Sequence, residues 1–406
     1  MESNDNNYIE ELPHEIFFNI LSRLPLQSLM QCKLVSKHYY TSIKHPLAIS
    51  MHLSQPKNNY LICFRDYPKS LDVVYLNPSH ENDNNMLLTI TNKPILPFES
   101  THFDFDVVGS CNGLVCLYNR LNNNNPLFIY NPFTKEYREL PHLVYLPNLV
   151  VLRVVLGFGF HPRTKTYKAI EIVYYMEGNN LYLGTIKETK VYVFNLGEDC
   201  QWRCIDQKPH KIITCPSSDV LVNGNLHWLT MRYQTHLVDI VSFDLDKEEF
   251  HVIPQPVDFG LNKSLTHLVT LNDRLSAVVS SKFGEHEIWV LKDYNKKESW
   301  SKEIVIPDYV PLGFRIDSAP PTRIRFNGSR NKAFRVLCNL QGGEEILFSY
   351  RDRCLVSYNP NHQEFKDFRT EGLPIEFEII VHTGSLIPVD AAFANNSATP
   401  SSTLNI

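Results

Sequence analysis

Two carboxylates stand two positions apart in the first third of the chain, where Asp104 and Asp106 flank Phe105. Side chains two positions apart in a β-strand point to the same face, so both carboxylates would lie together. Paired acids can carry out general acid–base catalysis, although alternation along a sheet edge explains them equally well. The sequence has no Gly-x-Ser-x-Gly elbow, no His-Glu-x-x-His pair and no phosphate loop with its lysine. We therefore expect a chain that performs no catalysis itself, and an enzyme is the lesser alternative.

The cysteines are spaced wrongly for a zinc or redox site. Cys111 and Cys116 form one close pair and Cys200 and Cys204 another, but neither pair has the two-residue gap of a zinc knuckle. Cys116 and Cys204 stand among apolar residues, where we expect reduced thiols that pack as small core side chains. An odd number of cysteines, spread over a long chain, indicates a reducing compartment, so we expect the cytoplasm or the nucleus. We expect neither a metal nor any other cofactor.

A few further residues could line a binding site. The glycines of Gly157-Phe158-Gly159 suggest a nucleotide loop, but no helical pattern follows them, so close packing within a strand is expected instead. His161 and Arg163 occupy the next turn and either line a binding face or are simply exposed. His227, beside Trp228, is expected to be a structural histidine. None of these patterns identifies the residues that would bind a target.

The composition is that of a large folded chain. Of its 406 residues, 43% are hydrophobic and 12% aromatic, enough for one or two ordinary domains. The net charge of -5 provides no basic field for nucleic acid. The longest apolar stretch, residues 149–160, is interrupted by Arg153 and is too short to span a bilayer, and the first residues contain no hydrophobic signal. We therefore expect no nucleic-acid or membrane partner.

Residues 12–50 predict a short body of three helices. Pro13 suits a first turn, apolar residues follow at helical spacing as far as Leu24, and Pro25 stops the first helix. Ser28 is expected to cap a second helix that carries Leu29, Cys32, Leu34 and Val35, and a third helix covers residues 37–43. A segment this short, below roughly 40 residues, cannot usually bury its own apolar side chains. The helices should therefore either pack on the rest of the chain or bind a partner.

Residues 57–388 predict a β-propeller. A repeated unit begins with an apolar strand that ends in Asn or Asp, which starts a turn, and a returning aromatic follows six or seven residues later. The five turn residues are 49 to 66 positions apart, close to the period of a four-stranded kelch-type blade, and they are Asn131, Asn195, Asp244, Asp293 and Asn359. This spacing indicates six or seven blades, with a pair of β-sandwiches as the competing fold. Residues 1–11 and 391–406 are expected to be disordered.

The helical segment resembles an F-box. The resemblance is carried by Leu12-Pro13, Glu15-Ile16, Ile20-Leu21, Leu24-Pro25, Ser28-Leu29, Cys32-Lys33 and Val35-Ser36-Lys37. Tyr39 stands where the family usually has Trp, and Ser42 where it usually has Leu, so weaker packing is expected there. An F-box implies docking on a Skp-family adaptor and, through it, on a cullin scaffold. The residues expected to bind the adaptor are Leu12, Pro13, Ile16, Ile20, Leu21, Leu24, Pro25 and Leu29.

The β-rich part resembles the F-box-associated interaction domain of plants, which is kelch-like and occurs in S-locus-type F-box proteins. The matching motifs are residues 109–116, 130–135, 157–162, 222–228 and 242–244. Together the two resemblances imply the substrate-recognition subunit of a Skp–cullin–F-box ubiquitin ligase, whose propeller binds an unknown target protein. The alternative is a β-propeller interaction protein with a degenerate F-box that acts outside a ligase.

Overall fold

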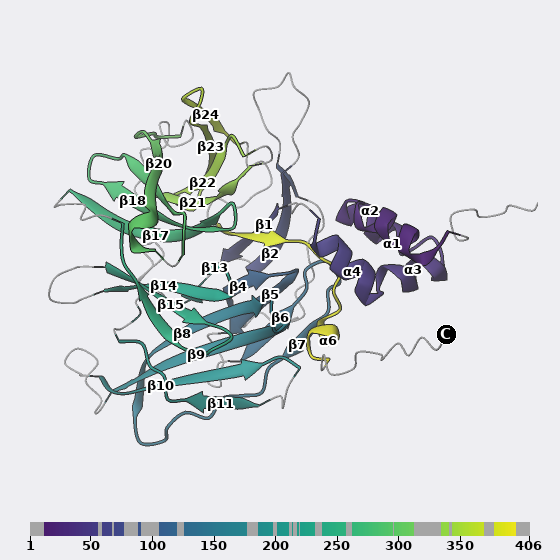
Figure 1. Cartoon of the computed structure of the whole chain (residues 1–406), viewed down its shortest axis with the longest axis horizontal. Coiled ribbons are helices and arrows are strands. Elements are labelled where there is room, and N and C mark those ends of the chain that lie inside the picture. Colours follow the sequence, from purple (N-terminus) through teal and green to yellow (C-terminus); the bar gives the residue numbers. More distant parts are fainter. Residues whose placement is uncertain are drawn as a thin grey trace, which may run out of the picture.

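A computed structural model places a small helical body against one end of a large ring of β-sheets (Figure 1). It describes residues 12–55, 59–66, 69–76, 88–90, 105–119, 126–176, 186–197, 201–210, 213, 217–218, 220–231, 238–256, 262–294, 296–311, 334–340, 343–368 and 377–394. The predicted disordered N-terminus and the Asp104 carboxylate lie outside these residues.

Four helices, not the expected three, form the helical body: α1 (His14–Ser22), α2 (Leu26–Cys32), α3 (Lys37–Ile43) and α4 (Pro46–Leu53). The unexpected helix is α4, and Pro46 lies in its first turn, where a missing N–H costs nothing. His45 caps α4, because its Nδ1 accepts a hydrogen bond from the Leu47 amide at 3.2 Å. The helical body therefore extends past the predicted boundary at residue 50.

The predicted start of the second helix was also wrong. α2 begins directly after Pro25, and Ser28 lies inside it and does not cap it. The helix ends at Cys32, so Leu34 and Val35 lie in the following turn. Ser36 caps the next helix instead, because its Oγ accepts a hydrogen bond from the Tyr39 amide at 3.3 Å at the start of α3.

The β-rich part consists of six sheets, which we call blades 1 to 6. From its innermost strand outward, blade 1 consists of β25 (Glu378–Thr383), β1 (Asn59–Asp66), β2 (Lys69–Leu76) and β3 (Leu88–Ile90). In the same order, blade 2 consists of β4 (Phe105–Cys111), β5 (Leu114–Asn119), β6 (Leu127–Tyr130) and β7 (Tyr137–Glu139). Blade 3 consists of β8 (Val150–His161), β9 (Thr166–Met176), β10 (Ile186–Asn195) and β11 (Trp202–Ile205).

The remaining blades follow the same order. Blade 4 consists of β13 (Leu221–Val222), β14 (Asn225–Met231), β15 (Val238–Asp244) and β16 (Phe250–Ile253). Blade 5 consists of β17 (Lys263–Leu271), β18 (Arg274–Ser281), β19 (His286–Leu291) and β20 (Trp300–Ile306). Blade 6 consists of β21 (Phe334–Asn339), β22 (Ile346–Tyr350), β23 (Cys354–Asn359) and β24 (Glu364–Asp367). The short strand β12 (Ser217–Ser218) pairs parallel with β8, a 3-10 helix η1 (Lys297–Ser299) precedes β20, and a short helix α6 (Val389–Ala392) follows β25.

The ring closes between the two ends of the chain. The last strand, β25, pairs antiparallel with the first, β1, from Asn59 opposite Thr383 to Phe64 opposite Glu378. Blade 1 therefore combines the beginning and the end of the β-rich part. The propeller prediction is confirmed, and the predicted six or seven blades are six.

The repeated unit of the sequence is the third and fourth strand of a blade. In four of the five copies the returning aromatic pairs with the residue just before the turn residue, as Tyr137 with Tyr130 and Phe365 with Tyr358. In blade 5, Trp300 pairs with Leu291, two positions before Asp293. Three of the turns between first and second strands contain an Asn with a positive φ angle, which is 46° for Asn112, 52° for Asn223 and 49° for Asn272. Asn tolerates this left-handed conformation, which explains why it recurs there.

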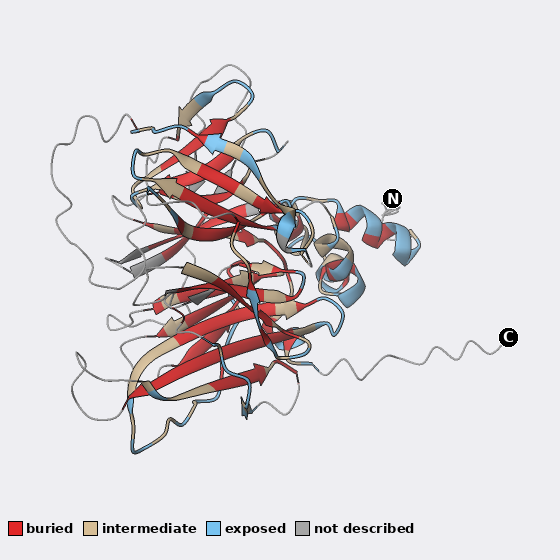
Figure 2. Ribbon diagram, turned by 60° about the vertical axis from the view of Figure 1, so that its left-hand side comes forward, coloured by how far each residue is buried: buried red, intermediate tan, exposed pale blue. Residues whose placement is uncertain are grey.

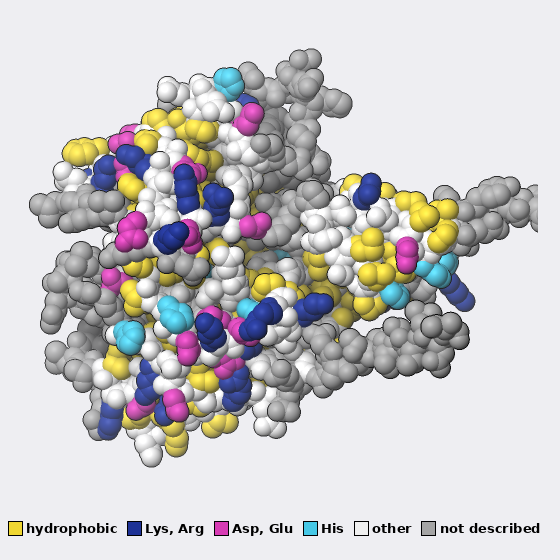
Figure 3. Space-filling model, viewed as in Figure 1, with side chains coloured by type: hydrophobic (Ala, Val, Ile, Leu, Met, Phe, Trp, Pro, Cys, Tyr) yellow, Lys and Arg dark blue, Asp and Glu magenta, His cyan; other side chains and the backbone are white. Residues whose placement is uncertain are grey.

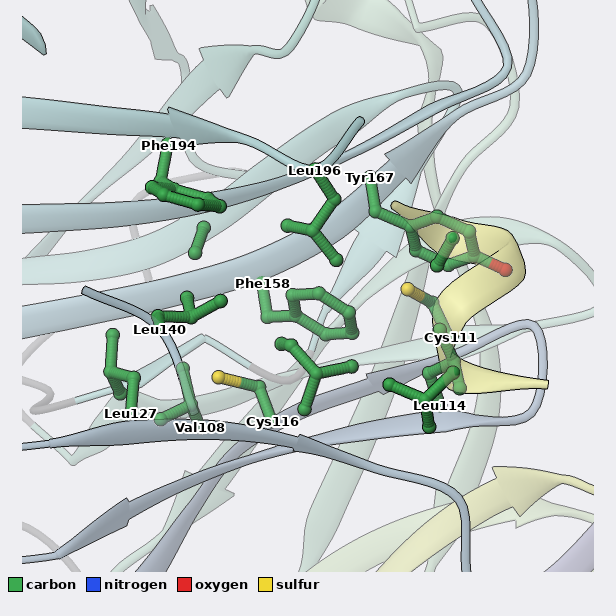
Figure 4. Close-up of a cluster of buried hydrophobic side chains, with 14 of the residues drawn as sticks. Val108, Cys111, Leu114, Cys116, Leu127, Leu140, Phe158, Tyr167, Phe194 and Leu196 are labelled. Carbon is green, nitrogen blue, oxygen red and sulfur yellow. The ribbon is translucent and has the colours of Figure 1, made fainter. Parts of the chain in front are cut away.

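Most of the core lies between neighbouring blades, where the buried strands face one another (Figure 2). One buried cluster joins blade 2 to blade 3, with Cys111, Leu114 and Cys116 opposite Phe158 and Phe194 (Figure 4). Burial raises the pKa of both cysteine thiols. Cys116 is thus the core residue that its sequence context predicts, whereas Cys204 lies on the outer strand β11 and is exposed, contrary to expectation.

Tryptophan and histidine side chains tie neighbouring blades together. The indole of Trp228 in blade 4 donates to the Leu156 carbonyl of blade 3 at 3.2 Å. His227, as expected a structural histidine, is buried and lies 2.8 Å from the Tyr294 hydroxyl of blade 5. Gly157 confirms the close packing predicted for it, because a Cβ there would lie 2.8 Å from both Leu226 and Trp228.

Candidate functional site: the two faces of the helices

One face of the helices is buried against the ring. Phe17, Leu21, Leu26, Leu29 and Ile43 form one cluster with four side chains from beyond the helices, which are Tyr60 and Val73 of blade 1, Phe133 of blade 2 and Leu386 after β25. For this face, the expectation that the helices pack on the rest of the chain is confirmed. The helical body thus gains from the ring the core that its own length cannot provide.

The other face of the helices exposes large apolar side chains (Figure 3). The exposed fractions are 51% for Ile16, 44% for Ile20, 87% for Leu34, 71% for Val35, 44% for Tyr40 and 47% for Leu47. We call these six residues the exposed apolar surface. Leu34 and Val35 are two of the four described large hydrophobic residues that are more than 70% exposed, and clustering of this kind is typical of a protein–protein interface.

The eight residues predicted to bind an adaptor divide between the two faces. Pro13, Ile16, Ile20 and Pro25 are exposed, and Leu12 and Leu24 are half-buried. Leu21 and Leu29 are only 2% and 4% exposed, because the helices turn them toward Tyr60 and Phe133, which are distant in the sequence. The assignment of the eight residues to an adaptor interface stays a prediction.

Sequence reasoning left Leu34, Val35, Tyr40 and Leu47 out of the site. Leu34 and Val35 were assigned to a helix that ends before them, and Leu47 belongs to the helix that was not expected. A signal for the first two was present, since Ser36 is a favoured N-cap residue and places the residues before it outside α3.

The position usually held by Trp in an F-box is filled by Tyr39. Its ring is half-buried, as expected, and meets Phe17 edge-on with centroids 5.4 Å apart. The neighbouring Tyr40 lies between two ammonium groups, with Lys44 Nζ 4.6 Å and Lys33 Nζ 5.7 Å from its ring centroid. Burial, followed by repulsion from Lys44, lowers the pKa of Lys33. A basic pair therefore borders the exposed apolar surface.

The residues of the ring that sequence patterns suggested for binding have structural roles. His161 is buried, not exposed as a loop residue would be, and its Nδ1 accepts a hydrogen bond from the Thr164 amide at 3.2 Å. Arg163 forms an ion pair with Asp246 of the neighbouring blade. Asp106, on β4, is half-buried. None of these residues joins the others in one site.

The most strongly perturbed carboxyl group in the described residues is Glu171, in the centre of blade 3. Burial raises its pKa to about 7, and a hydrogen bond from the Tyr145 hydroxyl at 2.5 Å partly opposes that rise. The side chain is 2% exposed, accepts the Tyr145 hydrogen bond and lies on β9 opposite Tyr192 of β10. Such a shift can mark a catalytic group, but burial alone accounts for it here.

Replacement of Glu171 by Gln should stabilise the protein above neutral pH. The folded chain holds a proton that the unfolded chain loses between pH 4.5 and about 7, so the wild type loses stability as the pH rises through this window. Glutamine keeps an acceptor for Tyr145 and cannot ionise. We expect a gain of about 3 kcal/mol at pH 8, from about 1.4 kcal/mol per pKa unit, and little change near pH 4.

Thermal unfolding of both proteins at each pH measures this effect. Burial lowers the pKa of His227 to about 4 and that of His382 to about 3, so these two groups make the free energy of unfolding rise with pH up to their ordinary pKa of 6.5. Both proteins contain these histidines, so their contribution cancels when the wild type and Glu171→Gln are compared at the same pH. Glu298→Gln on the exposed surface is the control. A gain for Glu171→Gln that is equal at pH 4 and pH 8 would refute the ionisation argument.

Two further properties of the described residues bear on function. No group of three or more His, Cys, Asp or Glu side chains among them could hold a metal ion. Within the same residues, no helix is long and apolar enough to cross a membrane.

Comparison with known proteins covers both parts of the chain. Residues 9–54 match a family model described as F-box-like, and residues 59–393 match one described as an F-box associated beta propeller domain. F-box protein At3g07870 of Arabidopsis thaliana is 38% identical over 93% of this chain and 92% of its own length. From the same plant, F-box/kelch-repeat protein At3g23880 is 26% identical over 73% of this chain and 79% of its own, and F-box protein CPR1 is 26% identical over 73% of each.

Proposed function

Because the chain belongs to the F-box proteins that carry an F-box associated β-propeller domain, we propose that it is the substrate-recognition subunit of a Skp–cullin–F-box ubiquitin ligase. The helices bind a Skp-family adaptor, and through it a cullin scaffold, and the propeller binds the target protein. The chemistry of ubiquitin transfer belongs to other subunits, and this chain contributes proximity and choice of target.

The exposed apolar surface is the observation that supports this proposal most directly. The helices already have an intramolecular partner on one face, so the apolar side chains on the other face are not needed to hold them to the ring. An adaptor that covered Ile16, Ile20, Leu34 and Val35 would remove them from water. Ile16 and Ile20 lie one helical turn apart and form the side of α1 that an adaptor helix would contact.

Substitution of Ile16 and Ile20 together by Asp should abolish adaptor binding. Each is an exposed apolar side chain, so the helices should stay folded, but two carboxylates would be buried in the complex without partners. A central interface residue is worth about 2 kcal/mol or more, which corresponds to a loss of at least about thirty-fold in affinity for one position alone. Co-purification of the full chain with a Skp-family adaptor measures the loss.

Two control variants make this experiment specific. Gln201→Asp adds a carboxylate to the exposed surface of the ring, beside β11, and should leave adaptor recovery unchanged. Leu29→Ala removes a buried core side chain, so it shows how far adaptor recovery falls when the helices are destabilised without any change to their exposed face. Equal recovery of the adaptor with wild type and the Ile16/Ile20 variant would overturn the assignment. Failure of the wild type to recover any adaptor would favour the alternative, a propeller interaction protein with a degenerate F-box.

We assign the target to the end of the propeller that faces away from the helices. Short turns such as Asn112-Gly113 and Asn223-Gly224 join the strands on the helical side. At the opposite end, the described connections expose Val144 and Phe283, at 85% and 76%. A target bound there would leave the helices free for the adaptor.

We propose that the complex acts in the cytoplasm or the nucleus. The seven described cysteines, all free, support a reducing compartment.

A further inference from the structure

A short segment after the closing strand runs between the ring and the helices. Residues 384–394, which we call the strap, continue from β25 and end with α6, beside β7 of blade 2 and close to the helical body (Figure 1). The expectation of disorder from Ala391 onward was therefore wrong for residues 391–394. Ala391 and Ala392 belong to α6, and Ala392 is buried in the cluster between blades 2 and 3.

The strap forms part of the core of the helical body. Leu386 is 4% exposed and packs in the same cluster as Leu21, Leu26 and Leu29. Space at this junction is tight, because a Cβ added to Gly384 would lie 2.6 Å from both Leu26 Cδ2 and Tyr60 Cε2. The strap therefore contacts the helices and the first strand of the ring at the same place.

The strap is also fastened to blade 2 by specific polar contacts. The side-chain amide of Asn131 donates to the carbonyl oxygens of Ser385 at 3.0 Å and Ile387 at 2.8 Å. The Val389 amide donates to Glu136 Oε2 at 3.0 Å. Arg138 lies over the Phe393 ring at 4.2 Å, which holds the end of the strap against β7.

The Asn131 side chain makes two kinds of hydrogen bond, one kind within its turn and one to the strap. Its Oδ1 accepts hydrogen bonds from the two amides that follow in the turn, of which the nearer is Phe133 N at 2.9 Å. Asp244 in blade 4 and Asn359 in blade 6 make the same pair of turn bonds through Oδ1. An Asp therefore serves this turn as well as an Asn, and the turn does not explain the Asn131 amide. Its Nδ2 is used for the strap.

We propose that the strap is a brace that fixes the angle between the helical body and the propeller, and that Asn131 is the residue that positions it. Leu386 connects the brace to the helices, and the Asn131 amide connects it to blade 2. A brace of this kind sets the distance between a bound adaptor and a bound target. This angle is a property of the chain itself, so it can be measured without the adaptor and does not depend on adaptor binding.

Substitution of Asn131 by Asp removes the hydrogen bonds to the strap and keeps those within the turn. The new carboxylate can still accept from Phe133 and Thr134, but it has no N–H for Ser385 and Ile387, and it faces their two carbonyl oxygens. Asn359→Asp is the matched control, because it makes the same chemical change in a turn of blade 6. Genetically encoded spin labels at Gln27 on α2 and Lys247 in blade 4, both exposed, report the distance between the helical body and the ring in the full chain.

The wild type and Asn359→Asp should each give a single narrow distance distribution, and Asn131→Asp should give a broadened or shifted one. Thermal unfolding checks that the ring stays closed in each variant. If Asn131→Asp itself unfolds, Leu386→Ser replaces it as the test variant. This substitution removes the contact of the strap with the helices and leaves blade 2 intact, and it should broaden the distance distribution in the same way. An unchanged distribution in the folded variant, or equal broadening in both variants, would overturn the proposal. Adaptor recovery, measured in parallel, should not change, and its absence in the wild type would count only against the proposed function.

Discussion

A chain that ends at Phe377 should fail to fold into a closed ring. It lacks β25, the innermost strand of blade 1, which provides every backbone partner on one edge of β1. Ile379 and Ile380, at 2% and 7% exposed, would be lost from two separate core clusters. Each buried Ile is worth about 2–5 kcal/mol, and a typical domain is stable by only about 5–15 kcal/mol. We therefore expect loss of the cooperative unfolding transition and association through the bare edge of β1.

Two comparisons make this truncation informative. A chain that ends at Thr383 keeps β25 and loses the strap together with the residues that follow it, so it should retain a cooperative transition at a reduced temperature. A synthetic peptide of residues 378–394, added to the chain that ends at Phe377, should restore the transition by strand addition. Calorimetry and size-exclusion chromatography measure both effects. A monomeric chain of residues 1–377 with the unfolding temperature of the wild type would contradict the closing role of β25.

Replacement of Trp228 by Ala should be among the most damaging single substitutions in the ring. The indole is 1% exposed, fills the space beside Gly157 and donates to the Leu156 carbonyl of the neighbouring blade. Its loss leaves a cavity between blades 3 and 4 and an unpaired buried carbonyl, for which we expect a cost of about 3–5 kcal/mol.

Trp300 provides the matched control for this substitution. Its indole also donates to a carbonyl of the preceding blade, that of Pro254 at 2.8 Å, but its ring is only half-buried. Trp300→Ala therefore removes the same kind of hydrogen bond with less apolar burial, and it should cost clearly less. Urea unfolding of the three proteins gives the comparison. Equal losses for the two variants would assign the effect to the hydrogen bond and not to packing.

The elements that the sequence predicted well have local causes. The turn residues Asn131, Asp244 and Asn359 bond to amides two and three positions ahead, so the repeat and its strand–turn–strand unit are visible in the sequence. The number of blades is less visible. Blade 1 takes its innermost strand from the other end of the chain, and no local pattern reveals a pairing between Asn59 and Thr383.

The faces of the helices were harder to predict than the helices themselves. The resemblance to an F-box gave the register of Leu21 and Leu29, but their burial depends on Tyr60, Phe133 and Leu386, which are distant in the sequence. The strap was missed for a related reason. Residues 391–394 have a composition typical of disorder, and they are ordered because Ala392 and Phe393 pack against the junction of blades 2 and 3.

The meeting of β1 with β25 also determines when, during synthesis, the protein becomes complete. The helices leave the ribosome first, yet the strand that closes the ring and the Leu386 side chain that completes the helical core come from the last part of the described chain. Every nascent chain therefore carries its helices, with their exposed apolar surface, for most of translation while the ring is open. A product that stalls before residue 378 would present those helices without a closed ring. The ring can therefore close, and Leu386 can complete the helical core, only after residues 378–386 have been synthesised.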